Sequence, residues 1–314
     1  MNKPDLAPFL ARFLSIACLN WTSLQGNAYI YRAIYKAVHL QRSTTPGLSV
    51  RCGRFAAVLV CAAHLLAPAE PVPAHHPEGT LHGFLALTTE QGQVLADGDL
   101  IEVVRGDRVT SHLTFRFKDG SLDEETAVYT QHGVFRLISD HHIQRGPYFP
   151  HPLDMTIDVA KGVVVTRSPG KDGKDEVSTD RVKMPADLYN GLVTPAVKNI
   201  SPDTGETRIA MIVAAPKPRI VTLVITPRAP ETFYLAGLPR KATVYEIKIE
   251  LGGIAGVIAP VIGKQPPNIS MQILGGEMPA FLRETGPLFE GGAPLSITLI
   301  GPTWSAASHD HSDK

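Results

Sequence analysis

Residues 241–251, K-A-T-V-Y-E-I-K-I-E-L, carry the pattern that decides the fold. Apolar side chains and one threonine stand at every second position, and charged side chains fill most positions between them. The first set is Thr243, Tyr245, Ile247, Ile249 and Leu251, and the second is Glu246, Lys248 and Glu250, with Val244 as the one apolar exception. Because the side chains of a strand point alternately to its two faces, this pattern predicts a β-strand with one buried and one solvated face. Such strands are typical of antiparallel sheets.

The same alternation recurs along the chain after residue 80. In residues 112–118, Leu113, Phe115 and Phe117 alternate with polar neighbours. We predict further strands at residues 80–88, 99–105, 125–129, 133–138, 162–167, 208–214, 219–226 and 295–300. Glycine-containing pairs that favour tight turns separate several of them, at residues 97–98, 119–120 and 172–173.

One helix is predicted in the middle of these strands. Pro185 suits a first helical turn, Leu188 and Leu192 would lie on one side, and Pro195 would end or kink the helix. About ten strands around one helix predict a mainly β fold, because wide twisted sheets tend to curl or close. We therefore expect a curved antiparallel sheet, or open half barrel, that wraps the helix, with a β-sandwich as the alternative.

Residues 50–74, V-R-C-G-R-F-A-A-V-L-V-C-A-A-H-L-L-A-P-A-E-P-V-P-A, have the layout of a secretory signal peptide. Two arginines precede an apolar run at residues 55–67, which is short for a membrane helix of about 20 residues. Small residues then allow cleavage after Ala69 or Ala74. We predict a bacterial protein that is periplasmic or secreted, with a single β-rich domain at residues 75–314.

The position of this signal, fifty residues into the chain, leaves two interpretations. Translation starts near Val50, at a GTG codon, and residues 1–49 are not part of the protein. Alternatively, the chain begins at Met1 and residues 1–49 form a disordered, cytoplasmic or membrane-surface extension.

Charge and cysteine content constrain the domain further. The chain has 30 basic and 30 acidic residues, but residues 1–74 hold seven basic and two acidic ones, so residues 75–314 carry a net charge of about −5. A mildly acidic domain argues against nucleic acid as a partner and against a strongly anionic membrane surface. The cysteines, Cys18, Cys52 and Cys61, all precede Ala74, which excludes a disulfide or a thiolate metal site from the domain.

Residues 140–154, D-H-H-I-Q-R-G-P-Y-F-P-H-P-L-D, hold the densest group of reactive side chains. Four of them could bind a metal: Asp140, His141, His142 and His151. Adjacent histidines on a strand point to opposite faces, so this spacing suits one shared ion poorly. The alternative is a structured crossing loop whose histidines cap backbone groups or face water. Arg145 and Tyr148 could instead contact a ligand carboxylate or headgroup.

Residues 252–267, G-G-I-A-G-V-I-A-P-V-I-G-K-Q-P-P, form an apolar, glycine-rich connection. Six residues separate Gly256 from Gly263, and Gln265 stands where a Walker loop needs Ser or Thr, so this is no phosphate loop. If exposed, the segment would act as a lid or a lipid contact; simple core packing is the alternative. Its candidate ligand contacts are Ile254, Val257 and Ile258.

Catalytic motifs are lacking elsewhere. There is no G-x-S-x-G nucleophile elbow. The carboxylates Asp123, Glu124 and Glu125 follow a glycine turn, and we expect them to form a solvated rim.

Several segments resemble an uncharacterised family of exported bacterial proteins. They are residues 139–147 (S-D-H-H-I-Q-R-G-P), 251–260 (L-G-G-I-A-G-V-I-A-P), 263–267 (G-K-Q-P-P), 274–277 (L-G-G-E) and 286–289 (G-P-L-F). The resemblance covers roughly residues 80–302 and none of residues 1–49. It implies a layout similar to periplasmic domains related to lipoprotein-localisation carriers, with an open half barrel around a helix and an apolar interior that can hold lipid chains.

These features predict a periplasmic, non-enzymatic binding protein for a lipid or other apolar small molecule, with no cofactor and no metal. The expected ligand contacts are His141, His142, Arg145, Tyr148, His151, Ile254, Val257 and Ile258. Two alternatives stay open: a metal-dependent hydrolase that uses the histidines and Asp140 of residues 140–151, and a structural protein with an envelope protein partner.

Overall fold

The computed structural model describes residues 71–170, 174–214, 217–235, 237–251 and 266–301. The chain divides into two units, Met1–Ala67 and Pro68–Lys314, and every described residue lies in the second unit. The extension at 1–49, most of the predicted signal peptide, and Ile254, Val257 and Ile258 lie outside the described residues. Within the described part, no helix is long and apolar enough to cross a bilayer.

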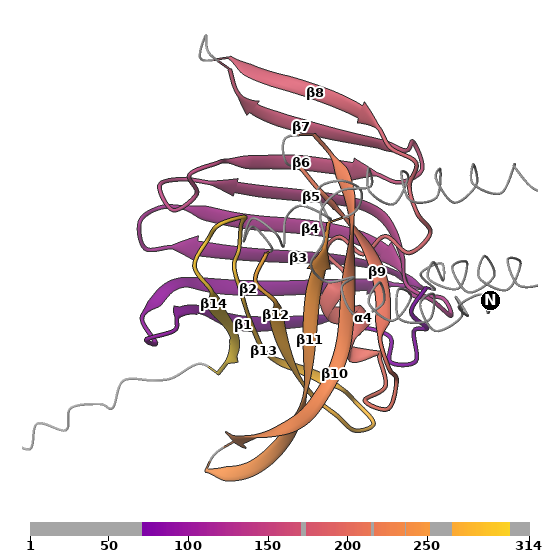
Figure 1. Cartoon of the computed structure of the whole chain (residues 1–314), viewed down its shortest axis with the longest axis vertical. Helices are drawn as coiled ribbons and strands as arrows, with labels where there is room; N and C mark the ends of the chain where they lie inside the picture. Colours follow the sequence, from indigo (N-terminus) through magenta and orange to yellow (C-terminus); the bar gives the residue numbers. More distant parts are fainter. Residues whose placement is uncertain (1–70, 171–173, 215–216, 236, 252–265, 302–314) are drawn as a thin grey trace, which may run out of the picture. The chain divides into compact units, whose positions relative to one another are not determined.

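Fourteen strands of the described residues form one antiparallel sheet (Figure 1). They are β1 (Leu81–Thr89), β2 (Val94–Arg105), β3 (Arg108–Phe117), β4 (Leu122–Thr130), β5 (Arg136–Arg145), β6 (Leu153–Asp158), β7 (Val163–Pro169), β8 (Asp175–Arg181), β9 (Thr207–Val213), β10 (Arg219–Leu235), β11 (Leu238–Glu250), β12 (Ile269–Leu274), β13 (Ala280–Gly286) and β14 (Leu295–Ile300).

The strand order is β8-β7-β6-β5-β4-β3-β2-β1-β14-β13-β12-β11-β10-β9. Strands β1–β8 form a first meander and β9–β14 a second one, and the pairing of β1 with β14 joins them. The sheet is not closed, because β8 and β9 remain as its edges. The predicted curved antiparallel sheet is therefore confirmed, and the sandwich of two sheets does not form.

The connector between the edge strands, residues 182–206, packs against both meanders. Figure 1 shows the strands β9–β11 running across β3–β6, and the main core lies between them. Its buried residues are Val109, Ala127, Tyr129, Leu137, Met155, Ile157 and Val164 from the first meander, Leu188, Tyr189, Leu192, Ala196, Val197 and Ile200 from the connector, and Ile209, Ile212, Leu223, Ile225, Tyr245, Ile247, Met271 and Ile273 from the second. We call the sheet face that carries these side chains the inner face.

The connector also covers the edge strand β9. Ala210 donates its N–H to the carbonyl of Asp187 and accepts the N–H of Tyr189, at 3.0 and 2.9 Å. The side-chain amide of Asn190 exchanges two hydrogen bonds with the backbone of Ile212, at 2.9 and 2.8 Å. The connector thus satisfies backbone groups that an open sheet edge would offer to another chain.

The helix is shorter and lies later than predicted. The helix α4 (Val193–Lys198) has six residues, and the stretch before it forms turns with a single bridge from Leu188 to Ala210. Pro195 does not end the helix but is its third residue, in the first turn, where no hydrogen bond from its nitrogen is needed. The predicted bounds are wrong because turns, rather than a helical face, bury Leu188 and Leu192.

Residues 140–145 belong to strand β5, so the predicted crossing loop is wrong for this half of the segment. Strand β5 pairs with β6 from Ser139 opposite Asp158 to Gln144 opposite Leu153, and only residues 146–152 connect them. Residues 140–145, D-H-H-I-Q-R, are polar on both faces of the strand, so hydropathy does not reveal their alternation of inward and outward side chains. Strands β6, β8, β12 and β13 were not predicted either.

Gly191 lets the connector approach the first meander closely. Its φ is +65°, and a Cβ built on it would lie 2.5 Å from Cβ of Ala127 and 3.2 Å from Oδ1 of Asp140. Glycine alone suits this position, because it has no Cβ to clash and no penalty at positive φ.

We expect Gly191→Ala to lower the free energy of unfolding by about 2–5 kcal/mol, combining about 1–2 kcal/mol of positive-φ strain with about 1–3 kcal/mol of overlap. Gly106→Ala is the matched control, since Gly106 also has φ of +65° but nothing within 4 Å of its would-be Cβ. Urea unfolding of the two variants measures the difference. Equal losses of unfolding free energy in both variants would show that the connector is not closely packed on the sheet at Gly191.

Candidate functional site

Polar side chains gather on the inner face of the neighbouring strands β4 and β5. Asp123 and Glu125 share this face with buried Ala127, and Asp140 and His142 face inward from β5, where His142 pairs with Glu125. We call Asp123, Glu125, Asp140, His142 and Glu284 the carboxyl cluster. Glu284 of β13 belongs to it because it pairs with fully buried Met271 and because its titration responds to the charge of Glu125.

A hydrogen-bond network holds one end of this cluster. Nε2 of His142 lies 2.8 Å from Oδ1 of Asp123, and the side-chain amide of Gln144 donates to Oδ2 of the same carboxylate at 3.2 Å. Gln144 also donates to the carbonyl of Leu288 at 3.0 Å, which ties the cluster to the second meander. The side chain of His142 keeps 23% of its surface exposed, so solvent reaches this end.

Asp140 is the most deeply buried member. It is 1% exposed, and neither of its carboxyl oxygens has a hydrogen-bond partner. Burial and then the nearby charge of Glu125 hold the pKa of Asp140 well above its usual range. A carboxyl group without partners is costly to ionise in an interior, so Asp140 favours its neutral form.

The other members titrate abnormally for the same physical reasons. Burial raises the pKa of Glu125, and burial together with the charge of Glu125 raises the pKa of Glu284 to about 7. Burial alone would lower the pKa of His142, but its bond to Asp123 and the surrounding carboxylates raise that pKa to about 9. The cluster therefore exchanges protons near neutral pH, with a cationic imidazole on one side and poorly ionised carboxyls on the other.

An apolar surface adjoins the cluster on the same face. Leu81, Leu100 and Leu299 surround Gly83, and each has an atom 3.9 Å from the position that a Cβ of Gly83 would take. Leu81 is 37% and Leu299 is 46% exposed, although both are on the inner face. We call Leu81, Gly83, Leu100, Leu113 and Leu299 the apolar strip; it meets the cluster where Leu113 pairs with Glu125.

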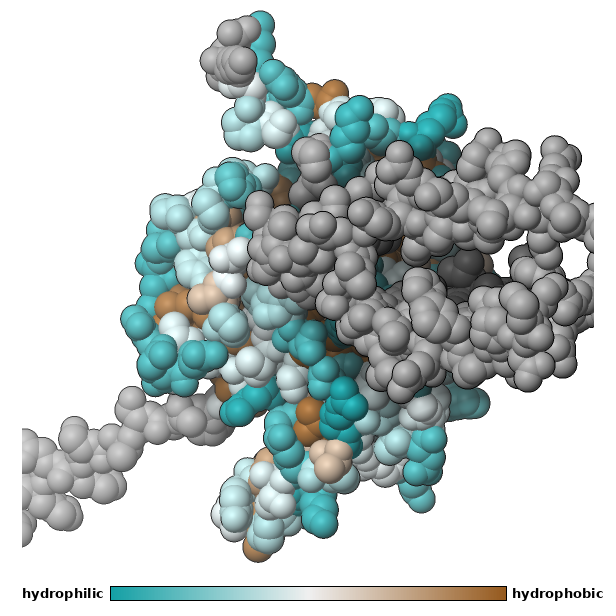
Figure 2. Space-filling view, viewed as in Figure 1, coloured by the Kyte–Doolittle hydropathy of each residue, from teal (hydrophilic) through white to brown (hydrophobic). Residues whose placement is uncertain are grey.

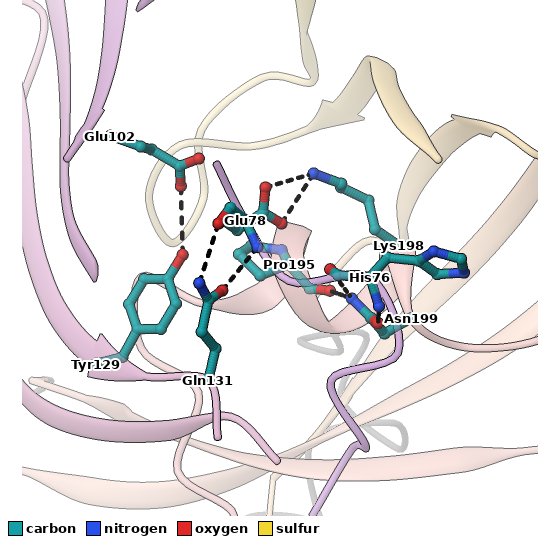
Figure 3. A network of polar contacts seen from close by, with 8 residues as sticks. All are labelled: His76, Glu78, Glu102, Tyr129, Gln131, Pro195, Lys198 and Asn199. Atoms are coloured by element: carbon teal, nitrogen blue, oxygen red, sulfur yellow. Dashed lines mark hydrogen bonds and ion pairs between the residues drawn. The ribbon is translucent and has the colours of Figure 1, made fainter. Parts of the chain in front are cut away.

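A second polar network fastens the N-terminal strap, residues 71–79, to the connector (Figure 3). Lys198 of α4 donates to both carboxylate oxygens of Glu78, at 2.8 and 2.6 Å, and this pair is largely buried. Asn199 exchanges two hydrogen bonds with the backbone of His76, and Gln131 exchanges two with the backbone of Glu78.

Hydrogen bonds and a β-bridge also hold the first residues of the strap in place. Val72 is 3% exposed and donates its N–H to the hydroxyl of Tyr189 at 2.6 Å. Pro73 forms a bridge with Val134, and Ala74 donates to the carbonyl of Gly133 at 2.9 Å. The packed domain therefore includes residues before position 75.

Glu102 lies beside this network (Figure 3). The hydroxyl of Tyr129 donates to its carboxyl group at 3.3 Å. Glu102 is 4% exposed, and burial followed by the charge of Glu78 raises its pKa to about 7. The interior thus contains carboxyls of raised pKa in both of its polar regions.

The structure separates the residues that the sequence singled out. His142 is in the cluster, whereas His141 faces the other side of β5 and lies 3.0 Å from Asp154. Arg145 and His151 are exposed. Tyr148 stacks on Phe117 with ring centroids 4.7 Å apart, in an aromatic group with Phe149 and Phe289.

Tyr148 also lines a small pocket with a volume of about 130 Å³. The lining residues are Gln93, Val94, Leu95, Phe117, Lys118, Asp119 and Tyr148. Pockets for drug-sized ligands have volumes of about 300–1,000 Å³. This pocket has room for a small apolar group at most.

A metal-dependent hydrolase gains no geometric support. Among the described residues, no three His, Cys, Asp or Glu side chains lie where they could hold a metal ion. His141 and His142 point to opposite faces, as their spacing predicts, so the four candidate ligands of residues 140–151 do not converge.

Sequence reasoning missed most of the cluster. The expectation of a solvated rim is wrong for Asp123, which is 7% exposed. The available signal was the alternation in L-D-E-E-T-A-V-Y-T, which places Asp123 and Glu125 on the side of Ala127 and Tyr129. Glu284 and the apolar strip depend on pairings between distant strands.

Comparisons with known proteins add little. No family model matches the chain, and no curated protein matches it. Among solved structures, the crystal structure of the hypothetical lipoprotein YmcC from Escherichia coli (K12) matches with a TM-score of 0.30 and 10% sequence identity, over 83% of this chain and 100% of that chain. A TM-score this low carries no conclusion about fold or function.

The cluster predicts that stability falls as pH rises. The pKa of Glu284 is raised from 4.5 to about 7 and that of His142 from 6.5 to about 9, so the folded state binds more protons than the unfolded chain between pH 4.5 and 9. We expect Tm to fall across this window, and Glu284→Gln to make the fall between pH 4.5 and 7 less steep, while Glu102, whose pKa is also about 7, retains part of it. Glu124→Gln, on the outer face of β4, is the control. Thermal unfolding over a pH series tests this, and a Glu284→Gln profile that parallels wild type would contradict it.

Proposed function

We propose that this protein is an exported, non-enzymatic binding protein that holds an amphipathic ligand of the lipid class against the inner face of its sheet. One observation carries this proposal: the apolar strip is partly open to solvent and runs directly into the carboxyl cluster. A ligand with an apolar chain and a polar end that donates hydrogen bonds or carries positive charge fits both surfaces.

The apolar strip supplies the contact for the chain. Core leucines of a sheet are normally covered, yet Leu81 and Leu299 are among the exposed large hydrophobic residues and face inward. Gly83 leaves a shallow space between them, since a strand residue with a side chain would fill it. Covering such surface with a ligand removes apolar area from water, which is the main driving force of lipid binding.

The carboxyl cluster supplies the polar end of the site. Asp140 has two unused acceptor oxygens, and no Lys or Arg among the described residues forms an ion pair with a cluster member. An amine or another donor placed here would compensate the buried carboxyls. The predicted headgroup contacts Arg145, Tyr148 and His151 would then lie outside this site, and His142 within it.

Of the two predicted cleavage positions, the packing of the strap favours the first. Cleavage after Ala74 would remove Val72 with its bond to Tyr189 and Pro73 with its bridge to Val134, whereas cleavage after Ala69 retains both. We expect the exported protein to begin at Glu70. Intact mass and N-terminal sequencing of protein from the bacterial periplasm test this, and an N-terminus at His75, or retention in the cytoplasm, would contradict it.

The test of ligand binding begins with native mass spectrometry and organic extraction of the protein, expressed from its full coding sequence and purified from the periplasm. A bound lipid at about one per chain would support the proposal. Titration with dodecylamine, dodecanol and dodecanoate then compares three amphiphiles of equal chain length, and we expect dodecylamine to bind most tightly.

Leu299→Ser should weaken dodecylamine binding by about three- to tenfold, because a partly buried leucine contributes on the order of 1 kcal/mol. Ile300→Ser is a close control, since the two residues are adjacent and 46% and 43% exposed but lie on opposite faces. An apo mass together with no binding of any of the three amphiphiles would overturn the proposal. Equal losses of dodecylamine affinity in the two variants would show that the apolar strip is not part of the binding site.

A further inference from the structure

The hairpin of β10 and β11 extends beyond the rest of the sheet (Figure 1). Strand β10 has 17 residues but pairs with β9 only through Ile225, and β11 pairs with β12 only from Thr243 onward. From Glu231 to Leu235, paired with residues 238–242 of β11, the hairpin is therefore a two-stranded ribbon, about 13 Å long at a rise of about 3.3 Å per residue. Two-stranded ribbons have little stability of their own, so one that projects beyond the sheet calls for an explanation.

Its tip exposes large apolar side chains. Tyr234 is 72%, Leu235 is 59% and Leu238 is 62% exposed. Leu235 pairs with Leu238 across the hairpin, and Tyr234 pairs with Pro239, so apolar groups cover both faces of the tip. Figure 2 shows hydrophobic colouring at this end of the molecule.

Positive charges stand immediately behind this apolar tip. Arg240 pairs with Phe233 and shares a face with Leu235, and Lys241 pairs with Thr232 and shares a face with Tyr234. Both cations are exposed and make no ion pair with the described residues. Glu231, the nearest carboxylate of β10, accepts a hydrogen bond from Gln272 at 2.7 Å.

We propose that this tip, Tyr234, Leu235 and Leu238 with Arg240 and Lys241 behind them, docks the protein on the surface of an anionic lipid bilayer. Apolar side chains that enter a bilayer reach about 5–10 Å into the boundary between headgroups and acyl chains, a depth that the last two or three residue pairs span. Tyrosine is enriched at that boundary. Arg240 and Lys241 would lie at the level of the lipid phosphates, on both faces of the ribbon.

Local charge complementarity favours an anionic bilayer as the partner. Residues 75–314 carry a net charge of about −5, but the cations Arg240 and Lys241 lie directly behind the apolar tip, and screening limits the reach of more distant charges to about 10 Å. Each such cation contributes about a fivefold gain in affinity for anionic membranes. This inference does not depend on the ligand proposed for the inner face, because it uses none of the same residues.

Vesicle sedimentation tests the proposal with the purified exported protein. We expect it to sediment with vesicles of equimolar phosphatidylcholine and phosphatidylglycerol and to stay in solution with phosphatidylcholine alone. A triple variant, Tyr234→Ser with Leu235→Ser and Leu238→Ser, should lower the bound fraction at least about tenfold. Arg240→Gln with Lys241→Gln should lower it on the anionic vesicles and reduce its sensitivity to salt.

Two single variants control for loss of exposed apolar surface in general. Met278→Ser and Val177→Thr change residues that are 84% and 58% exposed outside the hairpin, and neither should affect sedimentation. Circular dichroism and Tm should match wild type in all variants, because every changed residue is exposed. Failure of wild type to sediment with either vesicle, or equal sedimentation of the triple variant, would overturn the proposal. Tip-dependent self-association without vesicle binding would also overturn it, in favour of a protein partner.

Discussion

The packing of the connector against the inner faces of both meanders is the interaction on which the rest of the structure depends. Tyr189 illustrates its reach: the ring is fully buried, its hydroxyl accepts the N–H of Val72, and its backbone binds Ala210 of β9. One residue therefore links the strap, the connector and the edge of the second meander. Without the connector, the main core would lose its six buried connector side chains, and β9 would be an open edge.

This packing also explains why one half of the inner face is packed and the other half is partly open to solvent. The connector and the second meander cover the inner side chains of β3–β7, and the main core lies there. Near the junction of β1, β2 and β14 a smaller core forms around Phe115 and Leu87, and the leucines beyond it remain partly open. The division between a packed half and an open half thus follows from where a connector of limited length can reach.

The sequence alone predicts the strands well where both faces differ in polarity. The alternation in residues 241–251 and the apolar set Leu113, Phe115 and Phe117 correspond to β11 and β3. It fails where inward positions are polar, as in β5, whose Asp140 and His142 face the interior. No local pattern reveals that Glu284 lies near enough to Glu125 for their charges to interact, because that proximity depends on how the two meanders fold across each other.

The carboxyl cluster costs stability in the absence of a partner. Several carboxyls with raised pKa values share an interior with one imidazolium, and the carboxyl oxygens of Asp140 have no hydrogen-bond partner among the described residues. Apolar side chains at these inward positions would pack without any desolvation penalty, as Ala127 does on β4. Buried polar groups that weaken a fold are characteristic of binding sites, where a ligand supplies the missing compensation. The cluster lies where the packed half of the inner face meets the open half, and a ligand could reach it there from solvent.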